Sequence, residues 1–156
     1  MNRITRHQMW IEMANTAAKR STCYRANVGA LIVSPENNVV SVGYNGPPAG
    51  EPHCTGLTCE RTESGGCKRS VHAEANAVNR APKRRFPKDS SLYCTYSPCE
   101  ECTRLILTQP KLTSVYYQTP YRVNDHLKWL IRAGVFVGRV TPNGMVISEE
   151  TKELVE

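Results

Sequence analysis

The sequence lacks long apolar runs, an apolar leader and an even number of cysteines. No stretch of about 18 apolar residues occurs among its 156 residues, which predicts no membrane span. The first residues, MNRITRH, carry charge without an apolar core, so no secretory signal is expected. Seven cysteines cannot all pair, and without a leader they favour metal binding in a reducing, cytoplasmic compartment over disulfides. Repeats and low-complexity tracts are also missing, and the length predicts one domain over residues 1–156.

The charge is unbalanced toward basic residues. Twenty Lys and Arg face fourteen Asp and Glu, which gives a net charge of +6 and a pI near 9.0. This balance is compatible with nucleic acid, with phosphorylated small molecules or with a merely hydrophilic surface. The densest basic run, at 83–85, lies between Pro82 and Pro87 and favours a solvated loop over a nucleic-acid contact.

Hydrophobic periodicity predicts alternating helices and strands. Helices are expected over 5–20, 71–79, 99–108 and 125–133. Strands are expected at 28–33, 39–43, 91–96, 113–117 and 135–137, with 145–147 as an optional short edge strand. One early hairpin followed by strands alternating with helices predicts an α/β fold, a three-layer α/β/α sandwich with a mixed five-stranded sheet.

Two short motifs carry the residues expected to perform chemistry. They are VHAE at 71–74 and YSPCEEC at 96–102. Cys99 and Cys102 are three residues apart, so on a helix their sulfur atoms leave the same face. Pro98 suits the first helical turn, where its missing N–H would be unpaired anyway. Both thiols are therefore expected at a helix N-terminus, which favours the thiolate form that binds metal.

A third ligand and a proton carrier come from the first motif. His72 would supply a ring nitrogen, and three protein ligands with an open fourth position are typical of catalytic zinc. Glu74 lies two residues further on, close enough to move protons beside the metal. Taken singly, a Cys-x-x-Cys pair also occurs in redox centres and structural zinc sites, and a lone histidine is commonly a surface or core residue. Together, H-x-E and P-C-x-x-C form the pattern of zinc deaminases that act on nucleobases.

The remaining cysteines suggest a second metal site. The segment 51–69 shows no periodicity, and an irregular loop of this length needs a tie to be ordered in a compact domain. Four thiolates would close a tetrahedron around a structural zinc, with His53 as an alternative ligand. The candidates are Cys23, Cys54, Cys59 and Cys67. The alternative is a set of unligated thiols in an irregular loop.

Longer stretches around these motifs narrow the match. They are STC at 21–23 with Arg25, VGA at 28–30, GYNGPP at 43–48, HC at 53–54, CKR at 67–69, HAEANA at 72–77, and TYSPC at 95–99 with Cys102. With these residues the sequence resembles the deoxycytidylate (dCMP) deaminase family of the zinc-dependent, cytidine deaminase-like superfamily. The zinc motif alone is shared by many deaminases, whereas the glycine-rich loop, Cys23 and the His53-Cys54 pair are typical of the nucleotide branch.

The resemblance implies a reaction and roles for residues. Zinc held by His72, Cys99 and Cys102 would activate water, and Glu74 would transfer its proton during hydrolysis of dCMP to dUMP and ammonia, which feeds dTMP synthesis. The expected substrate contacts are the backbone of Ala73 and the carbonyl near Ser97 for the pyrimidine edge, Asn45 for the sugar, Arg25 for the phosphate and Tyr121 over the base. Tyr121 would otherwise be a packing residue and Arg25 a surface cation.

The resemblance also implies an assembly and its regulation. Similar proteins are hexamers activated by dCTP and inhibited by dTTP, so a homo-oligomer with these effectors is expected. The stretches 108–111 and 119–122 depart from the family pattern, which leaves dCTP or a 5-substituted dCMP open as the preferred substrate. Two other functions stay open: a deaminase of bases within RNA or DNA, as tRNA adenosine deaminases are, and a structural zinc-binding module that would leave Glu74 without a role.

Overall fold

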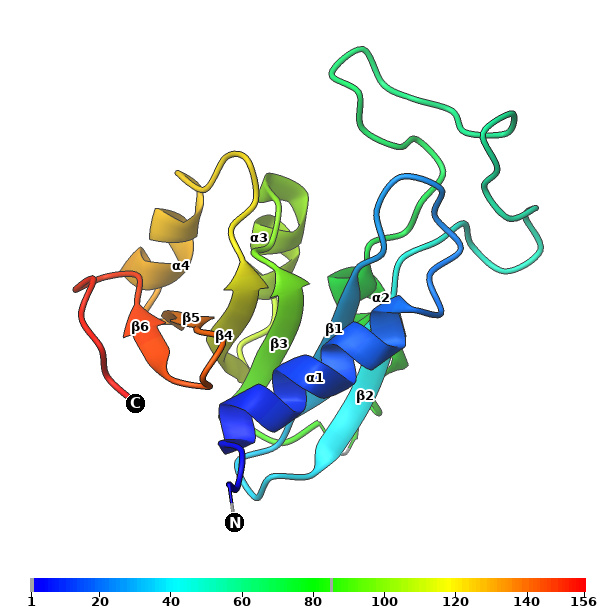
Figure 1. Ribbon diagram of the computed structural model, residues 1–156. Coiled ribbons are helices and arrows are strands. Elements are labelled where there is room, and N and C mark those ends of the chain that lie inside the picture. The colour runs from blue at the N-terminus through cyan, green and yellow to red at the C-terminus, as the bar shows by residue number, and fades with distance from the viewer. Residues whose placement is uncertain (1, 85) are drawn as a thin grey trace.

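The fold is a mixed sheet with helices on both faces (Figure 1). The structure is a computed structural model that describes residues 2–84 and 86–156; Arg85, the last residue of the basic run, and Met1 lie outside the described residues. In chain order the elements are α1 (Arg6–Ala18), β1 (Gly29–Val33), β2 (Val39–Tyr44), α2 (Ala73–Arg80), β3 (Ser90–Tyr96), α3 (Glu100–Leu107), β4 (Leu112–Thr119), α4 (Leu127–Arg132), β5 (Phe136–Val140) and β6 (Val146–Ser148).

The strand order places the two motifs side by side. The order is β2-β1-β3-β4-β5-β6, with β2, β1 and β3 antiparallel, β3, β4 and β5 parallel, and β6 antiparallel to β5. Helix α2 follows the β1–β2 hairpin and α3 follows β3. Parallel β3 and β4 are connected through α3, as a crossover requires. The starts of α2 and α3 therefore meet at one end of the sheet.

The helices divide between the two faces of the sheet. One core joins α2, α3 and α4 to the sheet through Ala77, Ile106 and Leu130. The other joins α1 to the opposite face through Trp10 and Ala14. The predicted α/β/α layering is confirmed. Among the described residues, no helix is both long and apolar enough to cross a membrane.

Among the described residues the sheet has six strands, one more than the five predicted, because the optional edge segment pairs with β5. The sixth is the short edge segment, Val146–Ser148, which is only 3 residues long and therefore gives almost no periodic signal. Its order comes from pairing. It forms an antiparallel ladder with β5, and on its other side Ile147 pairs with Leu154 of the C-terminal tail.

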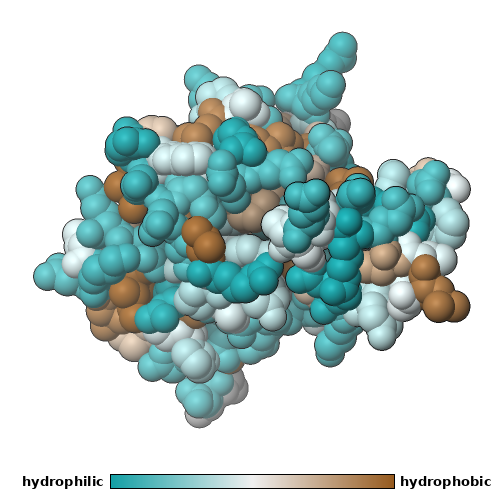
Figure 2. All heavy atoms as spheres, turned by 90° about the horizontal axis from the view of Figure 1, so that it is seen from above, coloured by the Kyte–Doolittle hydropathy of each residue, from teal (hydrophilic) through white to brown (hydrophobic). Residues whose placement is uncertain are grey.

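Residues 51–70 form an irregular segment that projects from the end of the sheet where α2 begins, and we call it the arm (Figure 1). Arg69 crosslinks it by donating hydrogen bonds to the carbonyls of Pro52 (2.7 Å) and Thr58 (2.9 Å). Seen from that end, the surface is mainly hydrophilic, with small separate apolar patches (Figure 2). Leu57 of the arm is 99% exposed.

Candidate active site

The start of α2 is pressed against the sheet by a glycine. A Cβ added to Gly43 of β2 would lie 2.1 Å from the carbonyl oxygen of Ala73, so only glycine permits this approach. Asn76 adds a hydrogen bond of 2.9 Å from its amide to the carbonyl of Tyr44. His72 is the N-cap residue and has extended backbone, so it lies just before the helix and not inside it as predicted. Its side chain is thereby free to turn toward α3.

The start of α3 carries the two thiols. Cys99 is the N-cap residue, and its sulfur accepts a hydrogen bond from the backbone N–H of Cys102 at 3.5 Å. Pro98 precedes this cap, so it lies just outside the helix and not in its first turn as predicted. The sulfur of Cys99 thus takes the place that an oxygen occupies in ordinary N-caps. This geometry directs both thiols to the same side of the helix start.

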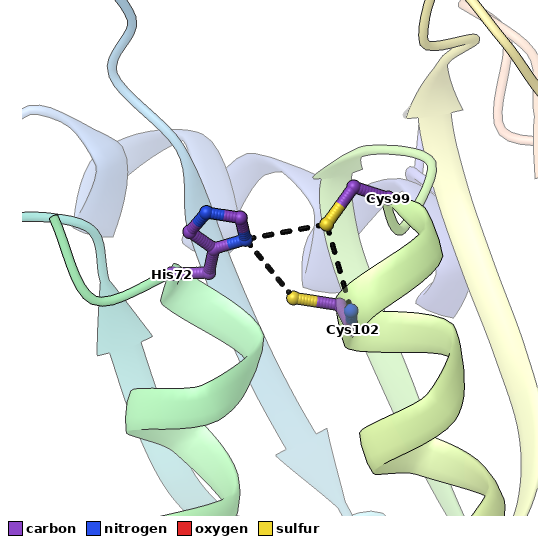
Figure 3. Close-up of side chains that lie close together, drawn as sticks. All are labelled: His72, Cys99 and Cys102. Atoms are coloured by element: carbon purple, nitrogen blue, oxygen red, sulfur yellow. Dashed lines mark hydrogen bonds between the residues drawn. The ribbon is translucent and has the colours of Figure 1, made fainter. Parts of the chain in front are cut away.

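The structure brings the three candidate ligands together (Figure 3). Nδ1 of His72 lies 3.3 Å from Sγ of Cys99 and 3.2 Å from Sγ of Cys102. Bond lengths of about 2.0 Å to nitrogen and 2.3 Å to sulfur, at a tetrahedral angle, put such atoms roughly 3.5 Å apart. The donor set and its spacing therefore fit one zinc ion. We call His72, Cys99 and Cys102 the helix-start cluster.

The charges within the helix-start cluster are strongly coupled. A hydrogen bond from Cys102 and a weaker contribution from His72 lower the pKa of Cys99 to about 3. The hydrogen bond to Cys99 raises the pKa of His72 to about 9, and hydrogen bonding to Cys99 also raises the pKa of Cys102. The cluster thus holds one thiolate and two displaceable protons, which suits a site that binds a cation.

Glu74 lies directly beside the cluster. The residue is 5% exposed, and its carboxylate accepts a hydrogen bond of 3.6 Å from Sγ of Cys102. Burial raises its pKa above the ordinary value for a glutamate. A carboxylate with a raised pKa is suited to taking up and releasing a proton near neutral pH.

His72, Cys99 and Glu74 line a cavity of about 450 Å³. All five predicted substrate contacts line it: Arg25, Asn45, Ala73, Ser97 and Tyr121. Sequence reasoning missed the arm as a wall of this cavity. Thr62, Ser64 and Gly66 contribute that wall, and no helical or strand period marks them. A hydroxyl-rich turn in an otherwise aperiodic segment was the available signal.

Asn45 is fixed by its own surroundings. Its Oδ1 accepts hydrogen bonds from the backbone N–H of Val28 (2.8 Å) and the hydroxyl of Ser21 (2.6 Å), and its Nδ2 donates to the carbonyl of Ala26 (2.8 Å). The residue therefore braces the loop that carries Arg25. One amide hydrogen of the side chain remains for a ligand.

The four cysteines of the predicted second site, Cys23, Cys54, Cys59 and Cys67, lie near one another without forming a compact cluster. Burial raises the pKa of Cys54, and so does the charge of Cys67, with smaller contributions from Cys23 and Cys59. Among the described residues, only the helix-start cluster has three ligand atoms within 4.8 Å of one another. His53 is exposed, and its carbonyl accepts a hydrogen bond from Thr58. The predicted second ligand set is thus assembled only loosely.

Known proteins with related sequence and structure fit this geometry. Residues 4–119 match the cytidine and deoxycytidylate deaminase zinc-binding region. ComE operon protein 2 of Bacillus subtilis is 34% identical over 155 residues, which cover 98% of this chain and 80% of that protein. The deoxycytidylate deaminase of Schizosaccharomyces pombe is 36% identical over 131 residues, which cover 80% of this chain and 40% of the longer yeast protein.

A solved structure extends the likeness to the fold. The dCMP deaminase of the cyanophage S-TIM5, in complex with dCMP and dUMP, matches with a TM-score of 0.72 and 32% identity, covering 85% of this chain and 94% of that chain. The family match over residues 4–119 includes both motifs, and their side chains converge as zinc chemistry requires. This chain belongs to the cytidine and deoxycytidylate deaminase family.

Proposed function

We propose that this protein is an enzyme that hydrolyses deoxycytidylate, dCMP, to dUMP and ammonia. The observation that carries the proposal is the helix-start cluster with Glu74 beside it, facing a cavity of nucleotide size. The cyanophage relative that binds dCMP and dUMP supports the choice of substrate. The dUMP that this reaction forms would feed dTMP synthesis.

The reaction replaces the amino group of cytosine with oxygen from water. A zinc ion held by His72, Cys99 and Cys102 would supply Lewis-acid activation of that water. Glu74 accepts the proton of the attacking water and delivers it to the ring nitrogen of the pyrimidine. It then helps a further proton reach the departing amino group, so that ammonia leaves and uracil remains. Its buried position keeps bulk water from competing for this proton.

The walls of the cavity suit the remaining parts of dCMP. The backbone of Ala73 and the carbonyl of Ser97 hold the polar edge of the pyrimidine. The spare amide hydrogen of Asn45 meets the sugar hydroxyl, and the Arg25 guanidinium meets the phosphate. Tyr121, which is 39% exposed, covers the base. All five residues line the same cavity, which supports these assignments.

A second, structural zinc site belongs to the proposal. Cys23, Cys54, Cys59 and Cys67 would bind the ion as four thiolates, with His53 as an alternative ligand. Two observations support this site. Cys67, Cys23 and Cys59 lie close enough to Cys54 to raise its pKa, and the arm has no helix or strand to order it. The ion would draw the four sulfur atoms into tetrahedral contact and tie the arm to the loop that carries Cys23.

The setting of the enzyme follows the family resemblance. We infer one catalytic domain over residues 1–156, a cytoplasmic location in which the free thiols stay reduced, and a homo-oligomer of six chains. Control by dCTP as activator and dTTP as inhibitor is part of the inference. Light scattering of the purified protein tests the assembly, and assays with and without each triphosphate test the control.

A panel of substrates tests the activity. Ammonia release should be fastest with dCMP, slower with dCTP or 5-substituted dCMP, and absent with a cytosine- or adenosine-bearing oligonucleotide. Release from the oligonucleotide alone would instead identify a deaminase of bases within RNA or DNA, which the basic charge of +6 favours. Zinc binding without any ammonia release would identify a structural module and contradict the proposal.

A further inference from the structure

The segment that carries Tyr121 is tied to the metal-ligand loop by a small hydrogen-bond network. Residues 119–126 run from the end of β4 to the start of α4, and they lie against residues 97–98 in the connection between β3 and α3 (Figure 1). The backbone N–H of Ser97 donates to the carbonyl of Thr119 at 2.9 Å. On the other side, Nε2 of His126 donates to the carbonyl of Pro98 at 2.7 Å. The segment 119–126 is thus hydrogen-bonded to residues 97–98 through both its first and its last residue.

The hydroxyl of Ser97 lies at the centre of this network. Its oxygen accepts a hydrogen bond of 2.7 Å from the backbone N–H of Tyr121, and its hydrogen is donated to Oδ1 of Asn124 at 2.7 Å. Ser97 is 2% exposed, so water cannot replace either bond. A hydroxyl can accept and donate at once, whereas an alanine at this position can do neither.

This hydroxyl joins two walls of one cavity. Ser97 and Cys99 line it from the segment that precedes α3, and Tyr121 lines it from the segment that follows β4. The backbone N–H of Tyr121 is hydrogen-bonded to the Ser97 hydroxyl, two residues before the metal ligand Cys99. This bond fixes the position of the Tyr121 backbone, and so the base of its side chain, relative to Cys99. The side chain of Asn124 accepts a hydrogen bond from the same hydroxyl. Its backbone carbonyl accepts one from the N–H of Leu127, which links the network to the start of α4.

We propose that the Ser97 hydroxyl and Asn124 are positioning residues that hold Tyr121 at the correct distance from the metal site and thereby set the affinity for the pyrimidine nucleotide. Neither side chain takes part in proton transfer. Without them, residues 119–126 would sample several positions, and binding of the base would carry the additional entropic cost of ordering this segment. The inference rests on the proposed function, in which Tyr121 covers the base.

Ser97→Ala tests the network, with Ser90→Ala as the matched control. Ser90 lies at the other end of β3, is fully buried, and donates a bond of the same 2.7 Å to the carbonyl of Pro87. Amide hydrogen exchange of the zinc-loaded protein should become faster across 119–126 in Ser97→Ala and stay unchanged there in Ser90→Ala. Unchanged exchange in Ser97→Ala overturns the inference, whatever the enzyme acts on.

Kinetics then separate positioning from general stability. Ser97→Ala should raise KM for dCMP roughly tenfold, the size expected for loss of a buried hydrogen bond, with a smaller change in kcat and unchanged zinc content. In a Tyr121→Ala background the same substitution should leave KM nearly unchanged, because the residue through which it acts is missing. Equal effects of Ser97→Ala in both backgrounds overturn the inference.

Asn124 provides an independent variant in case Ser97→Ala folds poorly. Asn124→Asp keeps an oxygen that accepts from Ser97 and should retain slow exchange and low KM, whereas Asn124→Leu should behave like Ser97→Ala. If both variants match the wild type, the network does not position Tyr121. A wild-type protein that releases no ammonia from dCMP would instead contradict the proposed function, and the exchange measurement would still decide the network.

Discussion

Two thiol-rich regions of this protein differ in how they are built. The helix-start cluster is assembled from two N-caps that are anchored to a six-stranded sheet, and its ligand atoms lie within 4.8 Å of one another. The four cysteines of the second region lie on the arm and on the loop before β1. Hydrogen bonds of Arg69, turns and an isolated β-bridge between Arg61 and Cys67 hold the chain there, without a helix or a strand. The first is preorganised by the fold, whereas the second would need the proposed ion to draw its four sulfur atoms together. Catalysis belongs to the first, because a fixed geometry is what lowers a barrier.

The largest expected effect separates chemistry from metal binding within the preorganised region. Glu74→Gln removes the proton carrier but keeps the size of the side chain, so kcat for dCMP should fall on the order of 10³-fold. Zinc content and melting temperature should stay close to wild type, because Glu74 is not a ligand. Glu100→Gln is the control, since Glu100 is exposed and pairs with Arg104 on α3. Retained ammonia release in Glu74→Gln would contradict the mechanism.

The next effect tests whether the sheet organises the cluster. A Cβ at Gly43 would lie 2.1 Å from the carbonyl oxygen of Ala73, so Gly43→Ala must push the start of α2 away from β2. We expect a loss of about 1–3 kcal/mol in the free energy of unfolding together with a loss of most activity, because His72 and Glu74 move with α2.

Gly65→Ala is the matched control on the arm. Gly65 has a positive φ of 82°, but no atom lies within 4 Å of an added Cβ. Only backbone strain of about 1 kcal/mol is therefore expected, with activity retained. Thermal unfolding and ammonia assays measure both variants. An equal loss of activity in the two would mean that the arm is organised as tightly as the helix starts.

A smaller effect is expected at the proposed second zinc site of the arm. Cys54→Ser should lower the zinc content from about two ions per chain to about one, because serine is a poor ligand for this site. Trypsin cleavage at Arg61 and Lys68 should become on the order of tenfold faster, since the arm loses its tie. Elemental analysis and limited proteolysis measure these changes. Cys94→Ala, which alters a fully buried thiol of β3, should change neither; one ion per chain in the wild type would contradict the second site.

The sequence predicted the preorganised region better than the arm, for a physical reason. Spacing and helix-start chemistry are local, so the ligand pattern of His72, Cys99 and Cys102 and the layers of the fold could be inferred from short windows. The brief sixth strand was predicted only as optional, because 3 residues give almost no periodic signal. The Ser97–Asn124 contact could not be predicted, because it joins residues that are 27 positions apart in the chain. The Thr62–Gly66 wall of the cavity likewise has no period of its own.

The smallest expected effect concerns the protons of the helix-start cluster. In the metal-free protein the pKa of His72 is raised to about 9, so His72 is protonated below that pH and zinc must displace its proton. Cys102, whose pKa is raised by hydrogen bonding to Cys99, loses a second proton, whereas Cys99, with its pKa lowered to about 3, is already a thiolate. Zinc affinity should therefore rise with pH, with about two protons released below pH 9 and about one above it.

Titration calorimetry in two buffers with different enthalpies of ionisation measures this proton release, and Cys54→Ser isolates the cluster from the arm. Release of three protons near neutral pH would mean that Cys99 is protonated in the metal-free protein. The helix start would then fail to prepare its thiolate, and the contrast with the arm would rest on geometry alone. Release of two protons would show that the fold prepares the charge of the cluster as well as the positions of its ligands.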